Sequence, residues 1–375
     1  MGTKIVFSGY FGANNAGDEA ILAAFLDRFS LEIKDFHPVV ISADPEKTAR
    51  TYGVKAVNKT DLRSIIKELK NASLLISGGG SLLQDVTGKK TIPYYLGVIA
   101  MAKLMNIPAF FCAQGVGPIK SGFYQKITKI ILNKTDTISV RDAESKNFLE
   151  KIGVKKEIHL TGDVGYLLNQ TSKAKVEKIM EVELGYREGT ERNTPYLGIS
   201  IRPWRDNSYL EYLTQIIVEF NKTYSEYEIL FIPMKYPDDY DLSVEAASKA
   251  KEKGVKTHVL KGRYLPTEVF GIISYMDLIL GIRLHSLVFA AMGETLPLGI
   301  SYDPKIPAFL SQMNLEPVGS IENLDPFTCM SNIQNYVNLK PGIEENLNSI
   351  QHEYKKRAKE NINLAMELLE AYHES

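Results

Sequence analysis

The sequence predicts an α/β protein with two domains, each organised around a parallel sheet. The chain has 375 residues, which is more than one hydrophobic core usually holds. Apolar runs of strand length alternate with helical patterns from residue 5 onward, and glycine-containing loops follow several of these runs. A polar segment at residues 169–194 interrupts the alternation, which resumes at Tyr196. We therefore expect domains at residues 1–170 and 171–342, followed by a separate segment at 343–375.

The expected elements of the first domain alternate between strand and helix. Strands are expected at residues 5–7, 39–42, 74–77, 109–113, 137–141 and 158–160. Helices are expected at residues 20–29, 94–104 and 123–132. A further helix follows Asp142, a good N-cap, and is closed by Gly153. This order is typical of strands that are joined in parallel through helices.

The second domain repeats the pattern after a helix at residues 173–184 and a loop at 185–190. Strands are expected at residues 196–202, 229–232, 258–260, 278–280 and 297–301, and a short buried helix at 287–293. Residues 343–372 predict one long, charged, amphipathic helix that packs back on the domains. For its basic cluster at residues 355–357, a solvated face is favoured over contact with an anionic membrane.

Composition and charge exclude several classes of protein. With 44 basic and 45 acidic residues the net charge is −1, so no global field attracts nucleic acid. Two cysteines argue against a disulfide scaffold and a cysteine-rich zinc site, and Cys112 is expected to be a buried small hydrophobe. The carboxylates at residues 237–241 are interpreted as a hydrated turn that starts a helix rather than as a metal site. No apolar run is long enough to cross a bilayer and no signal peptide is evident, so the cytoplasm is the expected location.

The stretch Gly281–Ser286 is the strongest candidate site in the sequence. It follows the apolar run at residues 278–280 and precedes the expected helix at 287–293, so Arg283 and His285 lie where a strand ends and a helix begins. In open α/β sheets ligands bind at that edge, and a helix N-terminus favours anions. A cation and an imidazole at this place indicate chemistry on a small anionic substrate. The alternative is that Arg283 only caps or pairs and that His285 is a packed helix residue.

Glycine loops follow three expected strands of the first domain. The first has the spacing Gly9, Gly12 and Gly17, which is not the dinucleotide fingerprint, and it offers Asn14, Asn15 and Asp18 at a helix start. A tight turn capped by Asp18 is the simpler interpretation. Gly78-Gly79-Gly80 with Gln84 follows the expected strand at 74–77, and Gln114-Gly115 follows the one at 109–113. Three consecutive glycines predict close approach by a ligand or by another backbone.

Two further cations stand at expected strand ends. Arg141 ends a strand of the first domain as Arg283 does in the second, so the two arginines are predicted to face each other across an interdomain cleft and to clamp carboxylate and phosphate oxygens. The alternative for Arg141 is a local pair with Asp142 or Glu144. Lys305 follows the strand at 297–301, and its alternative is a surface lysine on the next helix.

These motifs together resemble the polysaccharide pyruvyltransferase family, and most closely its bacterial branch that modifies the secondary cell-wall polymer anchoring S-layer proteins. The matching segments, which extend from about residue 5 to 310, are Gly9-Tyr10-Phe11-Gly12, Asn14-Asn15, Gly17-Asp18-Glu19-Ala20, Ser77-Gly78-Gly79-Gly80-Ser81-Leu82-Leu83-Gln84-Asp85, Gln114-Gly115-Val116-Gly117-Pro118, Ser139-Val140-Arg141-Asp142, Thr161-Gly162-Asp163, Gly281-Ile282-Arg283-Leu284-His285-Ser286 and Tyr302-Asp303-Pro304-Lys305.

The resemblance implies two Rossmann-like domains in a GT-B-type arrangement with an interdomain cleft. It also implies phosphoenolpyruvate as donor and a 4,6-linked pyruvate ketal on a sugar as product. The positions that match the family's usual donor-site residues are Arg141, Arg283, His285 and Lys305. The expected acceptor contains an N-acetylhexosamine, either free or lipid-linked. If the acceptor is lipid-linked, the enzyme would bind peripherally to the inner face of the membrane. No obvious apolar anchor in the sequence supports such binding.

Site roles follow from this chemistry. His285 is expected to act as general acid and base, while Arg283, Arg141 and Lys305 neutralise the donor, with no metal or other cofactor. The expected catalytic residues are His285, Arg283 and Arg141, and the expected substrate-binding residues are Lys305, Asn14, Asn15, Asp18, Gly79, Gly80, Gln84, Gln114, Gly115, Gly281 and Ser286. One alternative is a GT-B glycosyltransferase that uses a nucleotide sugar, with Arg202 and Trp204 at its base-stacking pocket. Another is a carbohydrate- or nucleotide-binding protein without catalysis.

Overall fold

The computed structural model describes residues 2–85, 91–185 and 194–373. The chain divides into two compact units, of which unit 1 comprises Met1–Leu168 with Glu353–Ser375 and unit 2 comprises Asn169–His352. Most of the loop expected at residues 185–190 lies outside the described residues. Within the described ranges, no helix is both long enough and apolar enough to cross a membrane.

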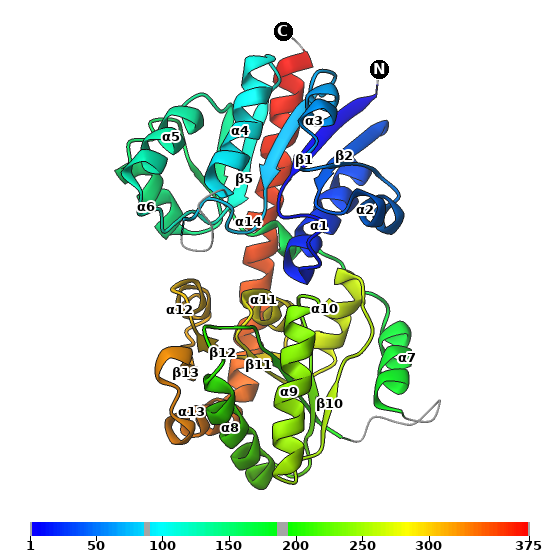
Figure 1. Ribbon diagram of the computed structural model, residues 1–375, viewed down its shortest axis with the longest axis vertical. Helices are drawn as coiled ribbons and strands as arrows, with labels where there is room; N and C mark the ends of the chain where they lie inside the picture. Colours follow the sequence, from blue (N-terminus) through cyan, green and yellow to red (C-terminus); the bar gives the residue numbers. More distant parts are fainter. Residues whose placement is uncertain (1, 86–90, 186–193, 374–375) are drawn as a thin grey trace. The chain divides into compact units, whose positions relative to one another are not determined.

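Unit 1 is built on a seven-stranded parallel sheet with the order β3-β2-β1-β4-β5-β6-β7 (Figure 1). Its strands are β1 (Thr3–Ser8), β2 (Phe36–Ser42), β3 (Lys55–Asn58), β4 (Leu74–Gly78), β5 (Ala109–Gln114), β6 (Thr137–Val140) and β7 (His159–Leu160). The strand order reverses direction between β1 and β4, so the loops after these two strands flank the topological switch point. β4 and β5 are buried along their whole length, as strands covered on both faces must be.

The helices of unit 1 connect successive strands. They are α1 (Ala16–Glu32), α2 (Pro45–Tyr52), α3 (Leu62–Leu69), α4 (Thr91–Leu104), α5 (Gly122–Leu132) and α6 (Ala143–Lys151), with the 3₁₀ turn η1 (Val164–Leu167) after β7. Asp142 caps α6 as predicted, because its side chain accepts a hydrogen bond from the backbone N–H of Ser145. The expected helix at 20–29 starts four residues earlier, because Asn15 rather than Asp18 is the N-cap of α1.

Unit 2 contains a six-stranded parallel sheet with the order β10-β9-β8-β11-β12-β13. Its strands are β8 (Tyr196–Ser200), β9 (Glu228–Phe231), β10 (Thr257–Val259), β11 (Leu278–Gly281), β12 (Leu296–Ser301) and β13 (Gly319–Ser320). Its helices are α7 (Lys173–Leu184), α8 (Tyr209–Thr223), α9 (Asp238–Glu252), α10 (Pro266–Ser274), α11 (Leu284–Met292), α12 (Lys305–Ser311), η2 (Ile321–Asn323) and α13 (Pro326–Asn338). The switch point of this sheet lies between β8 and β11.

The last helix, α14 (Lys340–His373), belongs to both units along its length. In unit 1, Tyr354 stacks on Tyr166 with 5.0 Å between ring centroids. Asn361 is fully buried; it donates to the carbonyl of Gly162 at 3.0 Å and accepts from the hydroxyl of Ser139 at 2.6 Å. The C-terminal part of α14 therefore completes the core of unit 1.

Candidate active site

The predicted site residues of unit 1 follow strands β1, β4, β5 and β6. Because the strands are parallel, their carboxyl ends meet at one edge of the sheet, where open α/β sheets bind ligands. The first loop is organised by its own amides. Asn15 accepts from the backbone N–H of Gly17 at 3.3 Å and donates to the carboxylate of Asp18 at 2.5 Å. Asn14 adopts a positive φ of 56° and accepts from the ammonium of Lys47.

Glu19, which was not among the predicted site residues, fixes this loop from the first turn of α1. Its carboxylate accepts from the backbone N–H of Gly12 at 2.7 Å and from the hydroxyl of Tyr52 at 2.8 Å. Burial raises the pKa of the Glu19 carboxyl above its ordinary value, against the opposing effect of these hydrogen bonds. The sequence signal was available, since Glu19 follows Asp18 at the start of an expected helix.

The three glycines at the end of β4 and directly after it allow close packing, mostly against α1. A Cβ on Gly78 would lie 2.9 Å from the backbone oxygen of Cys112, which is the close backbone approach that the sequence predicts. A Cβ on Gly79 would meet Ile21 at 2.6 Å, and one on Gly80 would meet the carboxylate of Asp18 at 2.6 Å. Gly79 and Gly80 also have positive φ values of 86° and 71°. The absence of side chains at Gly79 and Gly80 therefore allows α1 to pack against the loop after β4, at the topological switch point.

The end of β5 and the start of the loop after it contact the loops after β4 and β6 and are buried from solvent. Gln114 is fully buried, and its amide donates to the backbone oxygen of Ser77 at 2.7 Å. A Cβ on Gly115 would lie 2.9 Å from the hydroxyl of Ser81 and 3.0 Å from the Arg141 guanidinium. Gln84 is half-buried in the loop after β4. Gly115 thus makes room for an arginine, and the contacts of Gln114 with substrate stay a prediction.

Arg141 is held in an almost enclosed position at this edge. Its guanidinium forms an ion pair with Asp163 at 2.6 Å, donates to the Ser81 hydroxyl at 3.0 Å, and lies 3.9 Å from Asp142. The side chains of Arg141 and Asp163 are each 9% exposed. The local partner Asp142 is therefore secondary, and Asp163, which follows β7, is the main partner. As placed, Arg141 ties together the loops after β4, β6 and β7.

Arg283 in unit 2 is held in the same way, by a buried aspartate. Its guanidinium donates twice to Asp239, at 2.9 Å from Nε and at 2.5 Å from one terminal nitrogen. Asp239 is fully buried at the start of α9, so the predicted hydrated turn at residues 237–241 is wrong at this position. Burial raises the pKa of the Asp239 carboxyl, and the Arg283 guanidinium opposes the shift. The pair aligns Arg283 at the N-cap of α11.

Among the neighbours of Arg283, Ser286 is fully packed and His285 is half-buried. Ser286 is fully buried, and its hydroxyl donates to the backbone oxygen of Arg283 at 2.7 Å. A Cβ on Gly281 would lie 2.6 Å from that hydroxyl, so these two residues fit the first turn of α11 against β11. His285 is half-buried in the same turn, and its ring centroid lies 6.4 Å from that of Phe289.

Two more cations follow the strands on either side of β11. Arg202 comes after β8 and Lys305 is the first residue of α12, after β12. The guanidinium of Arg202 lies 4.4 Å, and the ammonium of Lys305 lies 5.0 Å, from the centroid of the Tyr302 ring. Two cations on one ring raise the local positive potential, which an anionic ligand would neutralise. Arg202, Arg283 and Lys305 therefore form a row of cations along three adjacent strands.

Trp204 packs beside this row. Its ring lies edge-on to Tyr302 with 5.2 Å between centroids, and its indole N–H donates to Glu322 at 3.1 Å. Glu322 also pairs with Arg205 at 2.8 Å. A carboxylate does lie beside Trp204, as a nucleotide-sugar enzyme would require, but it is engaged by these two side chains.

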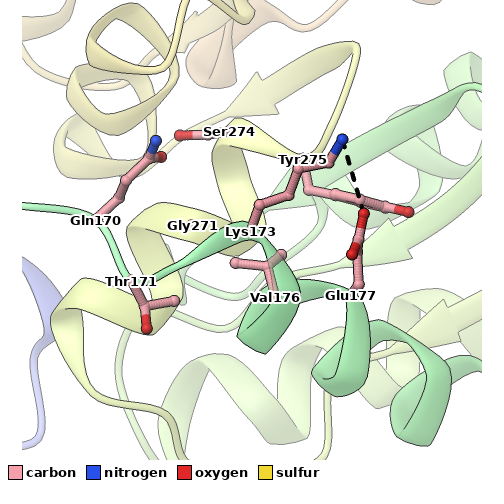
Figure 2. A pocket seen from close by; sticks show the side chains of 8 residues that line it. All are labelled: Gln170, Thr171, Lys173, Val176, Glu177, Gly271, Ser274 and Tyr275. Carbon is pink, nitrogen blue, oxygen red and sulfur yellow. Dashed lines mark ion pairs between the residues drawn. The ribbon is translucent and has the colours of Figure 1, made fainter.

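Two cavities of unit 2 lie away from all predicted site residues. The first, of about 270 Å³, lies between the start of α7 and the end of α10 and is drawn in Figure 2. Its rim carries the pair Lys173–Glu177, at 3.8 Å, and Gly271 lets α7 approach α10, since a Cβ there would meet Val176 at 2.6 Å. The second, of about 820 Å³, lies between α8, α9 and α13. Among the described residues, no group of three or more potential metal ligands is found.

Comparison with known proteins identifies the family. Residues 15–304 match the sequence profile of the polysaccharide pyruvyl transferase family. The chain belongs to this family. A curated relative, the amylovoran biosynthesis protein AmsJ of Erwinia amylovora, is 20% identical over 84% of this chain and 88% of its own length. The family resemblance expected from the motifs is therefore confirmed.

Solved structures share the fold at low sequence identity. UDP-GlcNAc 2-epimerase from Neisseria meningitidis has a TM-score of 0.64 and 12% identity, over 98% of this chain and 100% of that chain. A glycosyltransferase from Rickettsia africae has a TM-score of 0.62 and 12% identity, over 98% of this chain and 99% of that chain. These likenesses and the two parallel sheets confirm the predicted α/β fold of two Rossmann-like units of the GT-B type.

Proposed function

We propose that the chain transfers the enolpyruvyl group of phosphoenolpyruvate to a sugar of a surface polysaccharide precursor, forming a 4,6-linked pyruvate ketal and releasing phosphate. The observation that carries this proposal is Arg283, which the buried Asp239 aligns at the start of α11, two residues before His285. Arg202 and Lys305 flank it on the adjacent strands. A donor that bears a carboxylate and a phosphate suits such a row of cations.

The reaction needs one proton carrier and compensation for negative charge. A proton added to the methylene carbon leaves an oxocarbenium-like C2, which one sugar hydroxyl attacks. Phosphate then departs, and a second hydroxyl attacks C2 to close the ring. The two hydroxyl protons are lost, one restoring the acid and one leaving with phosphate. In this proposal His285 carries the proton, because an imidazole can donate and accept near neutral pH.

The side chains of the row would bind and neutralise the donor. Arg283 and Lys305 stabilise the carboxylate and the departing phosphate, so no metal or organic cofactor is required in this proposal. A chelator in the assay should leave the rate unchanged. The motif resemblance favours an N-acetylhexosamine of an S-layer-anchoring cell-wall polymer as acceptor. Phosphoenolpyruvate is an intracellular metabolite, so the reaction would take place in the cytoplasm.

A donor comparison tests the proposal. The protein is incubated with an N-acetylhexosamine-containing glycolipid and either phosphoenolpyruvate or a set of nucleotide sugars. We expect phosphate release with the first donor and a glycolipid that gains the mass of a pyruvylidene group. Release of nucleotide instead would favour the glycosyltransferase alternative. Release of neither across a panel of acceptors would favour a binding protein.

Two variants separate the roles within the site. His285→Ala should abolish turnover and largely keep donor binding, measured by calorimetry, because only the proton carrier is removed. Arg283→Ala should raise the KM for phosphoenolpyruvate, with kcat also reduced if the guanidinium acts in the transition state. Near-wild-type turnover of His285→Ala would contradict its assignment.

A further inference from the structure

Helix α5 in unit 1 presents two large apolar side chains to solvent on one face. Phe123 is 67% exposed and Ile130 is 47% exposed, and residues seven apart lie two helical turns along the same face. Thr128 and Leu132 are buried on the opposite face, and Ile127 and Ile131, which are partly buried beside the exposed pair, pack against the core. Phe123 and Ile130 are therefore not among the side chains that pack α5 against unit 1.

The same helix, with the residues that flank it, carries a local excess of positive charge, and two of the four lysines lie within the helix itself. Residues 118–135 contain four lysines and no aspartate or glutamate, although the whole chain has a net charge of −1. All four lysines are exposed, and among the described residues none of their ammonium groups forms an ion pair, although the carboxylate of Asp85 accepts from the backbone N–H of Lys120. They are Lys120, Lys126, Lys129 and Lys134. We call Phe123, Ile130 and these lysines the α5 surface.

Other candidate surfaces lack one half of this combination. Phe327 is 84% exposed, but it borders the 820 Å³ cavity, whose lining carries three glutamates and only two lysines and so has no positive excess. On α14, Lys355 and Lys356 are exposed, whereas Tyr354 before them is buried. Arg357 after them is half-buried and donates to the backbone oxygen of Thr161. Within two turns of these lysines on α14, no large apolar side chain is exposed among the described residues.

We propose that the α5 surface binds an anionic phospholipid bilayer. Helices that lie in a membrane interface combine apolar side chains, which enter the headgroup boundary, with lysines that face anionic headgroups. Each lysine near an anionic surface strengthens binding about five-fold, and screening by salt weakens it. With two apolar side chains and four lysines, the binding is reversible and depends on anionic lipid.

The position of α5 connects this surface to the candidate site. α5 follows β5, whose carboxyl end bears Gly115 next to Arg141, and it lies at the outer rim of unit 1, away from β1 (Figure 1). The start of the helix, with Phe123, is thus the part closest in sequence to the site edge. If the proposed function holds, docking by α5 would bring that edge to lipid-linked sugar acceptors.

Vesicle flotation tests membrane binding without reference to activity. The full-length protein is mixed with vesicles of phosphatidylcholine alone, or of equal parts phosphatidylcholine and phosphatidylglycerol. We expect flotation only with the anionic vesicles, and its loss at high salt. Lys126→Glu with Lys129→Glu should weaken binding roughly 25-fold or more, since two contributions of about five-fold are lost. Phe123→Ser with Ile130→Ser should also weaken it.

Two matched controls make the test specific. Lys355→Glu with Lys356→Glu makes the same charge change on α14, and Leu104→Ser removes a side chain that is 85% exposed at the end of α4. Both should float as the wild type does, and thermal unfolding should confirm that every variant folds. Flotation with neutral vesicles, no flotation at all, or equal loss in the α14 control would overturn the proposal. A self-associated dimer that Phe123→Ser with Ile130→Ser dissolves would do the same.

Discussion

Arg141 and Arg283 are each aligned by a buried aspartate that lies far away in the sequence. Asp163 lies 22 residues from Arg141, and Asp239 lies 44 residues from Arg283. A buried ion pair of this kind contributes little net stability compared with apolar packing, but losing one partner leaves an uncompensated buried charge. The aspartates therefore position the arginines.

Replacing Asp239 tests this positioning role. Asp239→Asn removes the charge that faces Arg283, and we expect a loss of about 3–5 kcal/mol in the free energy of unfolding. The control is Asp238→Asn on the same turn, where the aspartate side chain is 45% exposed and pairs with Lys235, and where the loss should be under about 1 kcal/mol. Denaturant unfolding measures both. Equal losses in the two variants would show that Asp239 is not the aligning partner.

The sequence predicted which cations stand at strand ends, but not what holds them. Arg283, His285 and Lys305 follow apolar runs, and periodicity locates such positions. The partners of Arg141 and Arg283 are brought close by neighbouring strands and helices, which no local pattern records. For Arg141 the sequence offered Asp142 or Glu144, yet Asp163 after β7 is the closer partner.

Among the elements, α1 and the loop after β4 fit each other through glycine. Gly80 has a positive φ of 71°, and a Cβ there would lie 2.6 Å from the Asp18 carboxylate. Gly80→Ala should destabilise the protein by about 1–3 kcal/mol, because strain adds to the clash. Gly97→Ala in α4, where a Cβ meets no atom within 4 Å, should be neutral or stabilising by up to about 1 kcal/mol. Thermal unfolding of the pair distinguishes the two sites.

Glu19 makes the junction of α1 and α2 dependent on pH. Because burial raises its pKa in the folded state, the stability that it contributes is present below the unfolded pKa of 4.5 and is lost as pH rises through the folded value. Glu19→Gln should therefore gain stability relative to wild type as the pH rises above 4.5. Melting temperatures measure the trend, with Glu46→Gln at an exposed position of α2 as control. A difference that stays constant with pH would contradict this.

The elements of unit 1 that the sequence missed are short and partly exposed. α2, β3 and α3 lie between two predicted strands, and β3 has only four residues, of which Val57 alone is buried. A four-residue edge strand gives no clear alternation. The cap signals were present, since Asp44 precedes Pro45 at the start of α2 and Asp61 caps α3.

At the scale of the whole molecule, unit 1 is assembled from two separate parts of the chain. The amide of Asn361 joins them with hydrogen bonds to Ser139, Thr161 and Gly162. Amphipathic periodicity predicted the helix at residues 343–372, but it could not indicate that the helix divides between the units after His352. An apolar helix face indicates that its side chains are buried, but it does not indicate which part of the protein they pack against.

Asn361 is the position at which this closure can be tested. Asn361→Ala leaves several buried groups without partners, each costing about 1–3 kcal/mol, so unit 1 should open at lower denaturant concentration. Asn363→Ala, two residues on and exposed, should match the wild type. Hydrogen exchange of β6 and β7 reports the opening. Unchanged protection of these strands in Asn361→Ala would contradict the role of α14.

This discontinuity sets the order in which the chain matures on the ribosome. Residues 169–352 are contiguous and emerge together, whereas unit 1 must wait for a segment that is synthesised after them. The Ser139–Asn361 hydrogen bond spans 222 residues. Unit 2 is therefore completed first, although domains generally mature from the N-terminus. Until residues 353–375 are synthesised, the surface of unit 1 that Ala358, Ile362 and Ala365 cover stays exposed to solvent.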